Sequence, residues 1–401
     1  MLIINLVDRL YSFIIFLLLA RNFSSVDYGQ TVTAFSLAAV FSIIFDLGFP
    51  AYLQREIAVE KQNASHIFTN VFLSYLIIFI PYAGLILLVY MLIYKSIALY
   101  LIAVICASMY ISSMVNLCNK ALSGMMDFKS QLVSFLVSRI FILIFFCAGL
   151  YYFMFDLNSL LTTVLIGFFL HMVVVFWYLD NNNIHLEIKT FDIKYILFVL
   201  RNTAPLGIAI IMTYLYDKID VLIISRLLDY AKVAVYNIGY GVYKSSSIAF
   251  SFILVSGFTR VSFLSRNRRG IYLFLKKYSA IIGFICFIVS VILILFATQI
   301  IHIIYTDKYR DSANILKILS IGIIAMGLNN VTGIILNGIG MYKAVMYITL
   351  FGLLINVGLN FAFIPVYGLM AATIITVITE YFIFGLEFYY LYKILKIKQR
   401  I

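Results

Sequence analysis

The sequence predicts an all-α integral membrane protein with twelve transmembrane helices in two six-helix bundles, related by a parallel pseudo-two-fold axis along the membrane normal. Three observations predict this fold class: an extremely apolar composition, apolar runs that recur at lengths of about 20 residues, and a short motif that occurs once in each half of the chain. We expect residues 1–185 to form the first bundle and residues 186–401 to form the second.

Composition separates this chain from soluble proteins. Of its 401 residues, 64% are hydrophobic and 11% are charged, and its mean hydropathy is +1.07. A soluble domain is about 45–50% apolar and about 25% charged. Runs of about 20 apolar residues suit helices that cross about 30 Å of hydrocarbon, whereas barrel strands would alternate over about 10 residues. Helical spans are therefore expected.

Twelve apolar runs follow one another along the chain, with short connections between them. The longest connections cover residues 180–195 and 259–278, and neither has room for an extramembrane domain. The first six spans centre near Ile14, Ala39, Ile80, Cys106, Leu143 and Phe168, and the second six near Ile211, Gly241, Ile285, Ile323, Leu354 and Thr376.

The charge distribution predicts the orientation. The formal net charge is +12, which in a soluble protein would indicate a nucleic-acid partner. With both termini in the cytoplasm, most lysines and arginines outside the spans fall on the cytoplasmic side, as the positive-inside rule requires. The basic residues at 266–269 are then a topology determinant at the anionic inner leaflet. No nucleic-acid partner is expected.

A motif at the end of the fourth span recurs at the end of the tenth with constant spacing. A weaker match pairs Gly48 and Phe49 with Gly257 and Phe258, each pair after the second span of its half. An even number of spans separates the copies, so the two halves should point the same way across the membrane. The first copy is Asn116, Leu122, Gly124, Phe128 and Lys129, and the second is Asn330, Leu336, Gly338, Tyr342 and Lys343.

The stretch from residue 205 to residue 244 carries charges at membrane depth. Asp217, Lys218 and Asp220 lie in one apolar span, and Lys244 lies in the next. A charge at the bilayer centre costs about 2.5–3.5 kcal/mol on insertion scales and normally faces water or another charge. In an antiparallel hairpin Asp217 and Lys244 would lie at equal depth, so we expect an ion pair or a paired cavity lining. A pair that only holds two helices together is the alternative.

Two arginines fall within predicted spans. Arg139 lies in the fifth span, and its permanent, planar charge suits a phosphate or another acid. Arg9 lies in the first span, with Asp46 in the second. Either Arg9 contacts Asp46 near the inner surface, or it lies at the level of the lipid headgroups because so little chain precedes it.

Polar side chains along two helices form the weaker part of the candidate site. Tyr236, Tyr240 and Lys244 recur every four residues. A tyrosine stripe is more often packing, but beside a buried lysine it is a candidate for contact with sugar rings. Asn116 belongs to a polar stripe along the fourth span, which marks either a wet face that would also contact sugars or a helix interface.

Acidic residues within spans are candidates for ion coupling. Glu380 lies near the middle of the last span, and Glu387 lies on the same face. A buried carboxylate can carry a proton or bind a cation. Asp217, Asp220, Glu380 and Asp46 are therefore candidates for ion coupling or ion pairing, and neutralisation by a neighbouring helix is the alternative.

The sequence carries no catalytic constellation. It has no glycine-rich phosphate loop and no cluster of metal ligands, and its four cysteines lie in or beside apolar runs. His171 stands alone on an apolar helix and is expected to be structural. We expect no cofactor, no metal and no enzyme activity. Two bundles with charged spans and short loops indicate a secondary transporter.

Several stretches together resemble a known family over nearly the whole chain. They are LLARNFSSVDYGQ at 18–30, FDLGFPAYLQREIA at 45–58, YDKIDVLIISRLLDYAKVAVYN at 216–237 and IPVYGLMAATIITVITE at 364–380. In order and helix position these are similar to polysaccharide flippases of the multidrug/oligosaccharidyl-lipid/polysaccharide exporter superfamily, and look most like the O-antigen (Wzx-type) flippases. Met370 departs from the last motif, where the family often has a second glycine.

The resemblance implies a function. The substrate would be an oligosaccharide repeat unit on undecaprenyl pyrophosphate, moved by alternating access from the inner to the outer leaflet of the bacterial cytoplasmic membrane. Arg139, Lys218, Lys244 and Arg9 would hold the anionic headgroup, while the polyprenyl tail stays among membrane lipids. A polysaccharide polymerase would be a further partner.

Two other functions compete with the flippase. A drug or cation exporter of the same superfamily would have a mainly acidic cavity, formed by Asp217, Asp220 and Glu380. A membrane glycosyltransferase or O-antigen polymerase would need a sizeable outer loop with catalytic residues, and the sequence offers none. The motif resemblance favours the flippase.

Overall fold

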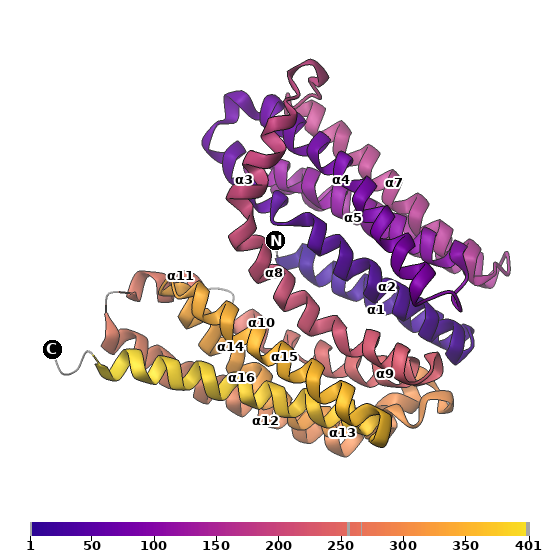
Figure 1. Ribbon diagram of the computed structural model, residues 1–401, viewed down its shortest axis with the longest axis vertical. Coiled ribbons are helices and arrows are strands. Elements are labelled where there is room, and N and C mark those ends of the chain that lie inside the picture. Colours follow the sequence, from indigo (N-terminus) through magenta and orange to yellow (C-terminus); the bar gives the residue numbers. More distant parts are fainter. Residues whose placement is uncertain (1, 255–256, 266, 398–401) are drawn as a thin grey trace. The chain divides into compact units, whose positions relative to one another are not determined.

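The computed structural model of the chain describes residues 2–254, 257–265 and 267–397. Arg266, part of the predicted topology determinant, lies outside the described residues. The chain forms two compact units, Met1–Tyr214 and Leu215–Ile401, and Figure 1 shows that helices dominate both. The seam between the units falls inside helix α8. The boundary expected between residues 185 and 186 stays a prediction.

The N-terminal unit contains seven α-helices and the beginning of the eighth. The side chains of Ser24, Asp127 and Asp156 accept hydrogen bonds from backbone amides of the first turns of α2, α6 and α7, which explains where these helices begin. Short 3-10 turns lie at Lys61–Asn63 and Ile188–Thr190. The helices are α1 (Leu2–Asn22), α2 (Ser25–Asp46), α3 (Phe49–Val59), α4 (Ala64–Leu92), α5 (Leu99–Gly124), α6 (Phe128–Tyr151), α7 (Leu157–Asn181) and α8 (Ile193–Leu227).

The C-terminal unit continues with the rest of α8 and eight further helices. Two of its predicted spans are interrupted: α9 is followed by a turn and the short α10, and α13 meets α14 at a bend of 45° beside Gly322. A 3-10 turn covers Asp307–Tyr309. The helices are α9 (Tyr230–Ser245), α10 (Ile248–Leu254), α11 (Gly257–Leu264), α12 (Arg268–Tyr305), α13 (Ser312–Ile321), α14 (Ile323–Gly338), α15 (Tyr342–Tyr367) and α16 (Leu369–Ile397).

The predicted fold class is confirmed. All twelve predicted span centres fall within helices of this all-α chain. Among the described residues, eight helices are long and apolar enough to cross a membrane by themselves, and α13 with α14 makes a ninth if the bent pair is one span. The other predicted spans are α1, α8 and α9. The last two of these carry the charged residues on which the candidate site depends.

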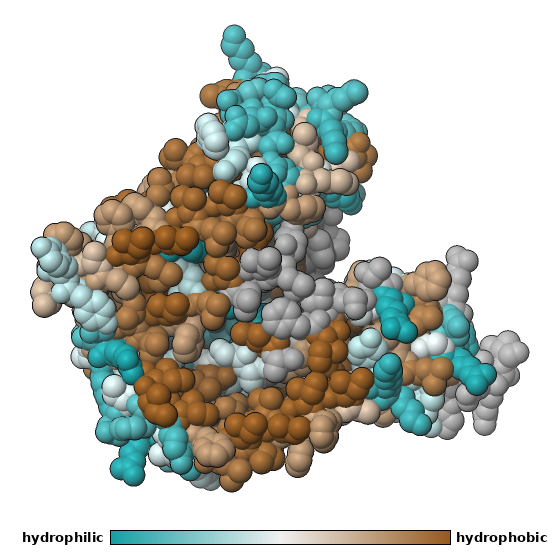
Figure 2. All heavy atoms as spheres, turned by 180° about the vertical axis from the view of Figure 1, so that it is seen from behind, coloured by the Kyte–Doolittle hydropathy of each residue, from teal (hydrophilic) through white to brown (hydrophobic). Residues whose placement is uncertain are grey.

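Apolar side chains cover much of the surface. On the face shown in Figure 2, hydrophobic side chains cover a large area, and hydrophilic side chains gather at its edges. Exposed residues such as Ile80, Phe287 and Leu354 lie in the middle of long helices. Exposed apolar patches on soluble monomers are rarely larger than a few hundred Å². A surface of this kind therefore indicates a lipid environment.

The internal repeat marks one packing contact in each unit. In the N-terminal unit α3 packs against α5, and a Cβ atom placed on Gly124 would lie 2.9 Å from Ile57. In the C-terminal unit α11 packs against α14, and a Cβ atom on Gly338 would lie 2.7 Å from Val261. Both glycines are therefore needed where a short helix crosses closely. The weaker match falls at the beginning of these short helices, since Gly48 precedes α3 and Gly257 begins α11.

Candidate functional site

The predicted hairpin of charged helices is present in the C-terminal unit. α8 ends at Leu227, and α9 begins at Tyr230 with the side chain of Asp229 capping its first turn. This short connection places the two helices side by side. The Lys244 ammonium lies 2.5 Å from an Asp217 carboxylate oxygen, so the two charges meet at matching depth.

Asp217 is shared by two lysines. Its Oδ1 atom accepts hydrogen bonds from Lys244 and, at 2.9 Å, from the Tyr240 hydroxyl, and its Oδ2 atom lies 3.2 Å from Nζ of Lys218. The side chains of Asp217, Lys218 and Lys244 are 22%, 35% and 46% exposed. These three residues, which we call the Asp217 cluster, leave one surplus positive charge on two partly exposed ammonium groups. Such a cluster suits an anion.

Asp220, one turn further along α8, is enclosed by neutral polar groups. Its Oδ2 atom accepts hydrogen bonds at 2.9 Å from the hydroxyls of Tyr236 and Thr376, and its Oδ1 atom accepts one at 2.8 Å from the Asn360 amide. The same amide donates to Asn356 at 2.9 Å, and the Asn360 carbonyl oxygen is buried without a partner among the described residues. This oxygen-rich enclosure suits a proton or a hard cation.

Two buried glutamates of α16 face α14. The Asn329 amide donates to Oε2 of Glu380 at 2.7 Å. Glu387, two turns further, is in hydrogen-bond contact with the Thr332 hydroxyl. Both carboxyl groups thus have hydrogen-bond partners on the neighbouring helix α14. This is the arrangement expected if a neighbouring helix neutralises them and they have no role in ion coupling.

Arg139 is buried inside the N-terminal unit. Its Nε and Nη2 atoms donate to one carboxylate oxygen of Asp8 at 3.3 and 3.1 Å. The rings of Tyr11, Phe135 and Phe168 surround the guanidinium at 4.7, 4.3 and 5.0 Å from Cζ to their centres. Its Nη1 atom is buried without a partner in the described part of the chain. In this conformation Arg139 holds α1 against α6, and it would meet a headgroup only after leaving Asp8.

The hydrogen bonds and ring contacts of Arg139 in the described part of the N-terminal unit do not include Arg9, Asn116 or Asp46. Arg9 and Asn116 are exposed on α1 and α5. Asp46, the last residue of α2, has one carboxylate oxygen buried without a hydrogen-bond partner in the described ranges. His171 is buried against Asn119, with 3.5 Å between their nitrogen atoms, which fits the expected structural role.

The two tyrosines predicted to contact sugars donate hydrogen bonds to carboxylates in this structure. Tyr236 is fully buried with its hydroxyl on Asp220, and Tyr240 donates to Asp217. Their rings stack with centres 5.8 Å apart. Contact between Tyr236 and a sugar therefore requires another conformation of this unit.

Several polar partners were not expected from the sequence. Asn356 and Asn360 stand one turn apart in the otherwise apolar α15, and this spacing was the signal that could have identified them. Thr376 and Thr332 carry no comparable signal, because threonine is common in membrane helices. Asp8 was not expected to pair with Arg139, since α1 and α6 are far apart in the sequence.

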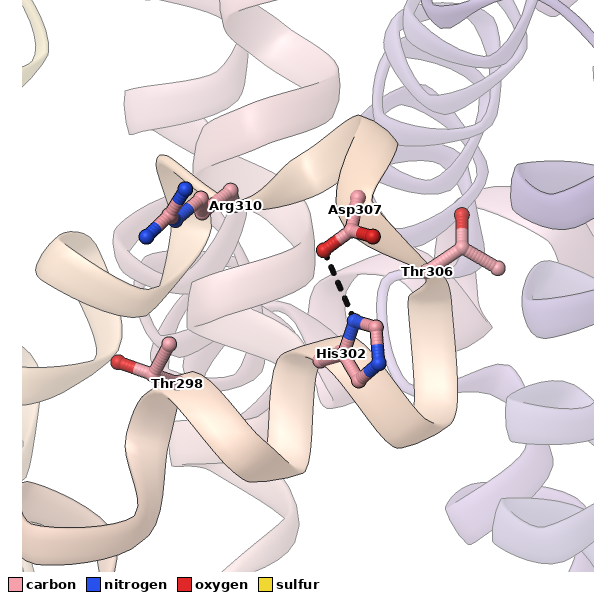
Figure 3. A pocket seen from close by; sticks show the side chains of 5 residues that line it. All are labelled: Thr298, His302, Thr306, Asp307 and Arg310. Atoms are coloured by element: carbon pink, nitrogen blue, oxygen red, sulfur yellow. Dashed lines mark hydrogen bonds and ion pairs between the residues drawn. The ribbon is translucent and has the colours of Figure 1, made fainter.

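A separate polar hollow of about 300 Å³ opens at the end of α12. Figure 3 shows His302 and Asp307 turned toward each other, with Nδ1 and Oδ1 2.8 Å apart. Both side chains are mostly exposed. The hollow shares no residue with the buried clusters. Its lining residues are Thr298, His302, Thr306, Asp307 and Arg310.

Two family models match the chain. The model described as "Polysaccharide biosynthesis protein" matches residues 1–263, and the MatE model matches residues 205–362. Two membrane proteins of Methanocaldococcus jannaschii, both named as uncharacterized, are similar in sequence. MJ1068 is 31% identical over 107 residues, or 27% of this chain and 21% of that protein. MJ1375 is 23% identical over 420 residues, or 99% of this chain and 97% of that protein.

Solved structures with the same fold are transporters. A multidrug resistance MATE family transporter of the MOP superfamily, in an inward-facing conformation, superposes with a TM-score of 0.83 at 14% identity, covering 98% of this chain and 95% of that one. The lipid II flippase MurJ superposes with a TM-score of 0.72 at 16% identity, covering 98% and 88%. Because the first family model covers more than half of the sequence, the chain belongs to the polysaccharide biosynthesis protein family, within the multidrug/oligosaccharidyl-lipid/polysaccharide exporter superfamily.

Proposed function

We propose that this protein moves lipid-linked oligosaccharides, such as an O-antigen repeat unit on undecaprenyl pyrophosphate, from the inner to the outer leaflet of the cytoplasmic membrane by alternating access. The observation that carries the proposal is the polysaccharide biosynthesis family match over residues 1–263. The fold shared with a lipid II flippase supports it. On this proposal the protein is a transporter with no catalytic role.

The Asp217 cluster supports a role in binding the pyrophosphate. Pyrophosphate and sugars cannot enter hydrocarbon without polar partners. An anion can draw Lys244 away from Asp217 without leaving that carboxylate unpaired, because Lys218 remains 3.2 Å from its other oxygen. Exchange of one partner for another costs less than exposing a lone charge in a partly buried site. Arg139 and Arg9 are secondary candidates for the same headgroup.

The enclosure of Asp220 supports coupling to a cation gradient. Three helices, α9, α15 and α16, place neutral donors around this one carboxylate of α8. A carboxylate without a cationic partner, with amide and hydroxyl oxygens beside it, is a suitable site for a coupling ion. Asp217, Glu380 and Asp46 remain further candidates for this coupling.

A flipping assay with purified protein tests the proposal. The full chain is reconstituted into liposomes that contain a fluorescent oligosaccharide on polyprenyl pyrophosphate, and a membrane-impermeant quencher reports the probe that crosses. We expect transport by the wild type, and at least about a tenfold loss for the double variant Lys218→Ala and Lys244→Ala, equivalent to about 1.4 kcal/mol of binding.

The matched control is Lys232→Ala, which removes an exposed lysine at the other end of α9. This variant should transport at the wild-type rate. A wild type that fails to move the probe contradicts the proposed function. A double variant that inserts normally and transports at the wild-type rate contradicts only the headgroup role.

A drug or cation antiporter is the second candidate function. The MatE model covers residues 205–362, the region that holds Asp217 and Asp220, and the MATE transporter has a high TM-score. The same liposomes, loaded with a fluorescent cationic drug under an ion gradient, distinguish the two functions. Movement of the drug without movement of the lipid-linked probe would favour the antiporter.

Two further parts of the proposal concern location and partners. The flippase would lie in the bacterial cytoplasmic membrane with both termini in the cytoplasm, surrounded by membrane lipids. A polysaccharide polymerase would consume the product in the outer leaflet and is therefore the proposed protein partner.

A further inference from the structure

The carboxyl group of Glu387 lies in the seam between α16 and α14. The residue is 4% exposed and seven positions beyond Glu380, or about 10 Å along the helix at 1.5 Å per residue. It lies on the side of Glu380 that is expected to be cytoplasmic. Its hydrogen-bond partner among the described residues is the hydroxyl of Thr332.

The number of hydrogen atoms available decides which group donates in the contact between Thr332 and Glu387. The Thr332 hydroxyl has a single hydrogen, and its oxygen lies 3.1 and 3.2 Å from the carbonyl oxygens of Leu328 and Asn329. Carbonyl oxygens only accept. The Thr332 hydrogen commonly points to a carbonyl oxygen of the helix that carries the threonine, here α14, and it is then not available to Glu387. In that case the contact with Glu387 is a hydrogen bond only if the carboxyl group donates. The geometry therefore fits a protonated carboxylic acid.

Glu380 provides a comparison on the same pair of helices. Its partner Asn329 has two amide hydrogens, which reach the backbone oxygen of Glu380 at 3.1 Å and its carboxylate at 2.7 Å. An amide can only donate to a carboxylate from its nitrogen, so Asn329 favours the ionised form. A hydroxyl can rotate between donating and accepting, so Thr332 can serve both forms of Glu387.

The charges around Glu387 also favour a bound proton. α14 has no ionisable side chain, and the tyrosines of the neighbouring helices are neutral near neutral pH. Within the described residues no ion pair involves Glu387, and an ionised Glu380 would place a second negative charge two turns away on the same helix. A second buried anion would be unpaired and costly. The other charged residues in the sequence of the helices packed against α16, and of α16 itself, are Lys317 of α13, Lys343 of α15, Lys232 and Lys244 of α9, and Lys393 and Lys396 of α16.

We propose that Glu387 is a reversible proton-binding site. Its carboxyl group holds a proton on the Thr332 oxygen. On release, the O–H bond breaks, the proton passes to water and the electron pair stays on the carboxylate, to which Thr332 then donates. The proton site rests on the contact with Thr332 and on the lack of an ion pair among the described residues, whereas its use in coupling rests on the proposed flippase function.

Infrared difference spectroscopy on the reconstituted full chain tests the bound proton. The spectrum of Glu387→Gln subtracted from that of the wild type should show the carbonyl band of a protonated carboxyl group in acidic buffer, and this band should fade as the pH is raised. Thr332→Val should shift the band to higher frequency because a hydrogen bond is lost. Thr332→Ser keeps the hydroxyl and should leave the band in place.

Each result has a defined meaning. Absence of the band in acidic buffer shows an ionised Glu387 and overturns the proposal, and a band that persists unchanged at alkaline pH shows a permanently protonated structural residue and also overturns it. In the flipping assay, Glu387→Gln should still transport but lose its dependence on a proton gradient. If the band titrates and no lipid moves even in the wild type, the proton site stands and the flippase function fails.

Discussion

At the scale of single residues, Asp217 shows how a membrane helix can carry several charges without isolating any of them. Each of its oxygens faces a different lysine, and Tyr240 adds a neutral donor. Removing the carboxylate would leave two ammonium groups close together, whereas removing one lysine leaves a simple ion pair. The aspartate is therefore the more sensitive position.

Exchanging the charges of Asp217 and Lys244 tests their pairing. The double variant Asp217→Lys with Lys244→Asp keeps the net charge of the Asp217 cluster, so it should recover more transport and more thermal stability than either single change. We expect a coupling energy of about 1 kcal/mol in a double-mutant cycle. Purely additive effects of the two changes would mean that the residues act independently.

Asp127 gives a prediction for the pH dependence of stability. It lies outside the spans, accepts hydrogen bonds from the Ser130 amide at 3.1 Å and the Asn182 side chain at 2.9 Å, and so joins the beginning of α6 to the end of α7. Partial burial raises its pKa, but these hydrogen bonds outweigh that effect and hold the pKa below its usual value. Because the folded pKa is the lower one, the stabilisation is present above about pH 4 and is lost as the pH falls through the folded pKa.

The variant Asp127→Ala should therefore lower the free energy of unfolding by about 1 kcal/mol near neutral pH. Its difference from the wild type should shrink in acid, as thermal unfolding in detergent would show. Asp311→Ala is the control, because Asp311 begins α13 without a side-chain capping bond. An equal loss in both variants would argue against the capping role of Asp127.

The sequence predicted residue contacts only where a short turn enforces them. The pairing of Asp217 with Lys244 follows from an antiparallel hairpin with a two-residue connection. The contact of Arg139 with Asp8 joins helices far apart in the sequence, and apolar patterning does not tell which distant helices pack together. Two neutral partners of Asp220, Asn360 and Thr376, were missed for the same reason.

At the scale of elements, the short helices α3 and α11 are the main feature that hydropathy could not reveal. Each lies in what the sequence presents as a connection, and neither is long enough to be a span. The glycines that accommodate them were visible as an internal repeat. The repeat was recognisable because a close crossing leaves no room for a side chain at that one position.

Alanine at these glycines should destabilise the protein. In an open helix Gly→Ala gains up to about 1 kcal/mol, but a Cβ atom at Gly124 or Gly338 meets atoms of α3 or α11 at 3.0 Å or less. Overpacking of this kind costs about 1–3 kcal/mol. Thermal unfolding of the full chain in detergent should show lower midpoints for Gly124→Ala and Gly338→Ala.

Gly84 and Gly358 provide matched controls. Both lie inside long helices, and a Cβ atom at either would meet nothing within 4 Å. Gly84→Ala and Gly358→Ala should leave the unfolding midpoint unchanged or raise it. Midpoints that fall equally in all four variants would mean that the close crossings are unimportant.

At the scale of the whole molecule, composition and run length were sufficient to predict helices at the twelve expected places. They did not predict the interruption between α13 and α14, because the residues on both sides of Gly322 are equally apolar. The break between α9 and α10 falls at residues 246–247, close to Lys244, and was not predicted either. The first span of the C-terminal half also proved to be longer than expected, since α8 continues without a break from Ile193 to Leu227.

The predicted orientation can be tested with two single cysteines. Met154, after α6, is 79% exposed and should face the outside, whereas Phe263 in α11 is 89% exposed and should face the cytoplasm. In a Cys147→Ser background, an impermeant thiol reagent added to intact cells should label Met154→Cys. It should label Phe263→Cys only after the cells are opened. Labelling of both from the same side would refute this topology.

Helix α8 has a consequence for any attempt to divide the protein. Residues up to Tyr214 belong to one compact unit and those from Leu215 to the other, while Gly207 lies directly against the backbone of Leu47. A chain cut in the connection at 182–192 would leave the stretch of α8 around Gly207 on the second fragment. The backbone of Leu47, against which this stretch packs, would remain on the first fragment. Separately produced halves should each be incomplete, and co-production of both fragments is the condition under which either should fold.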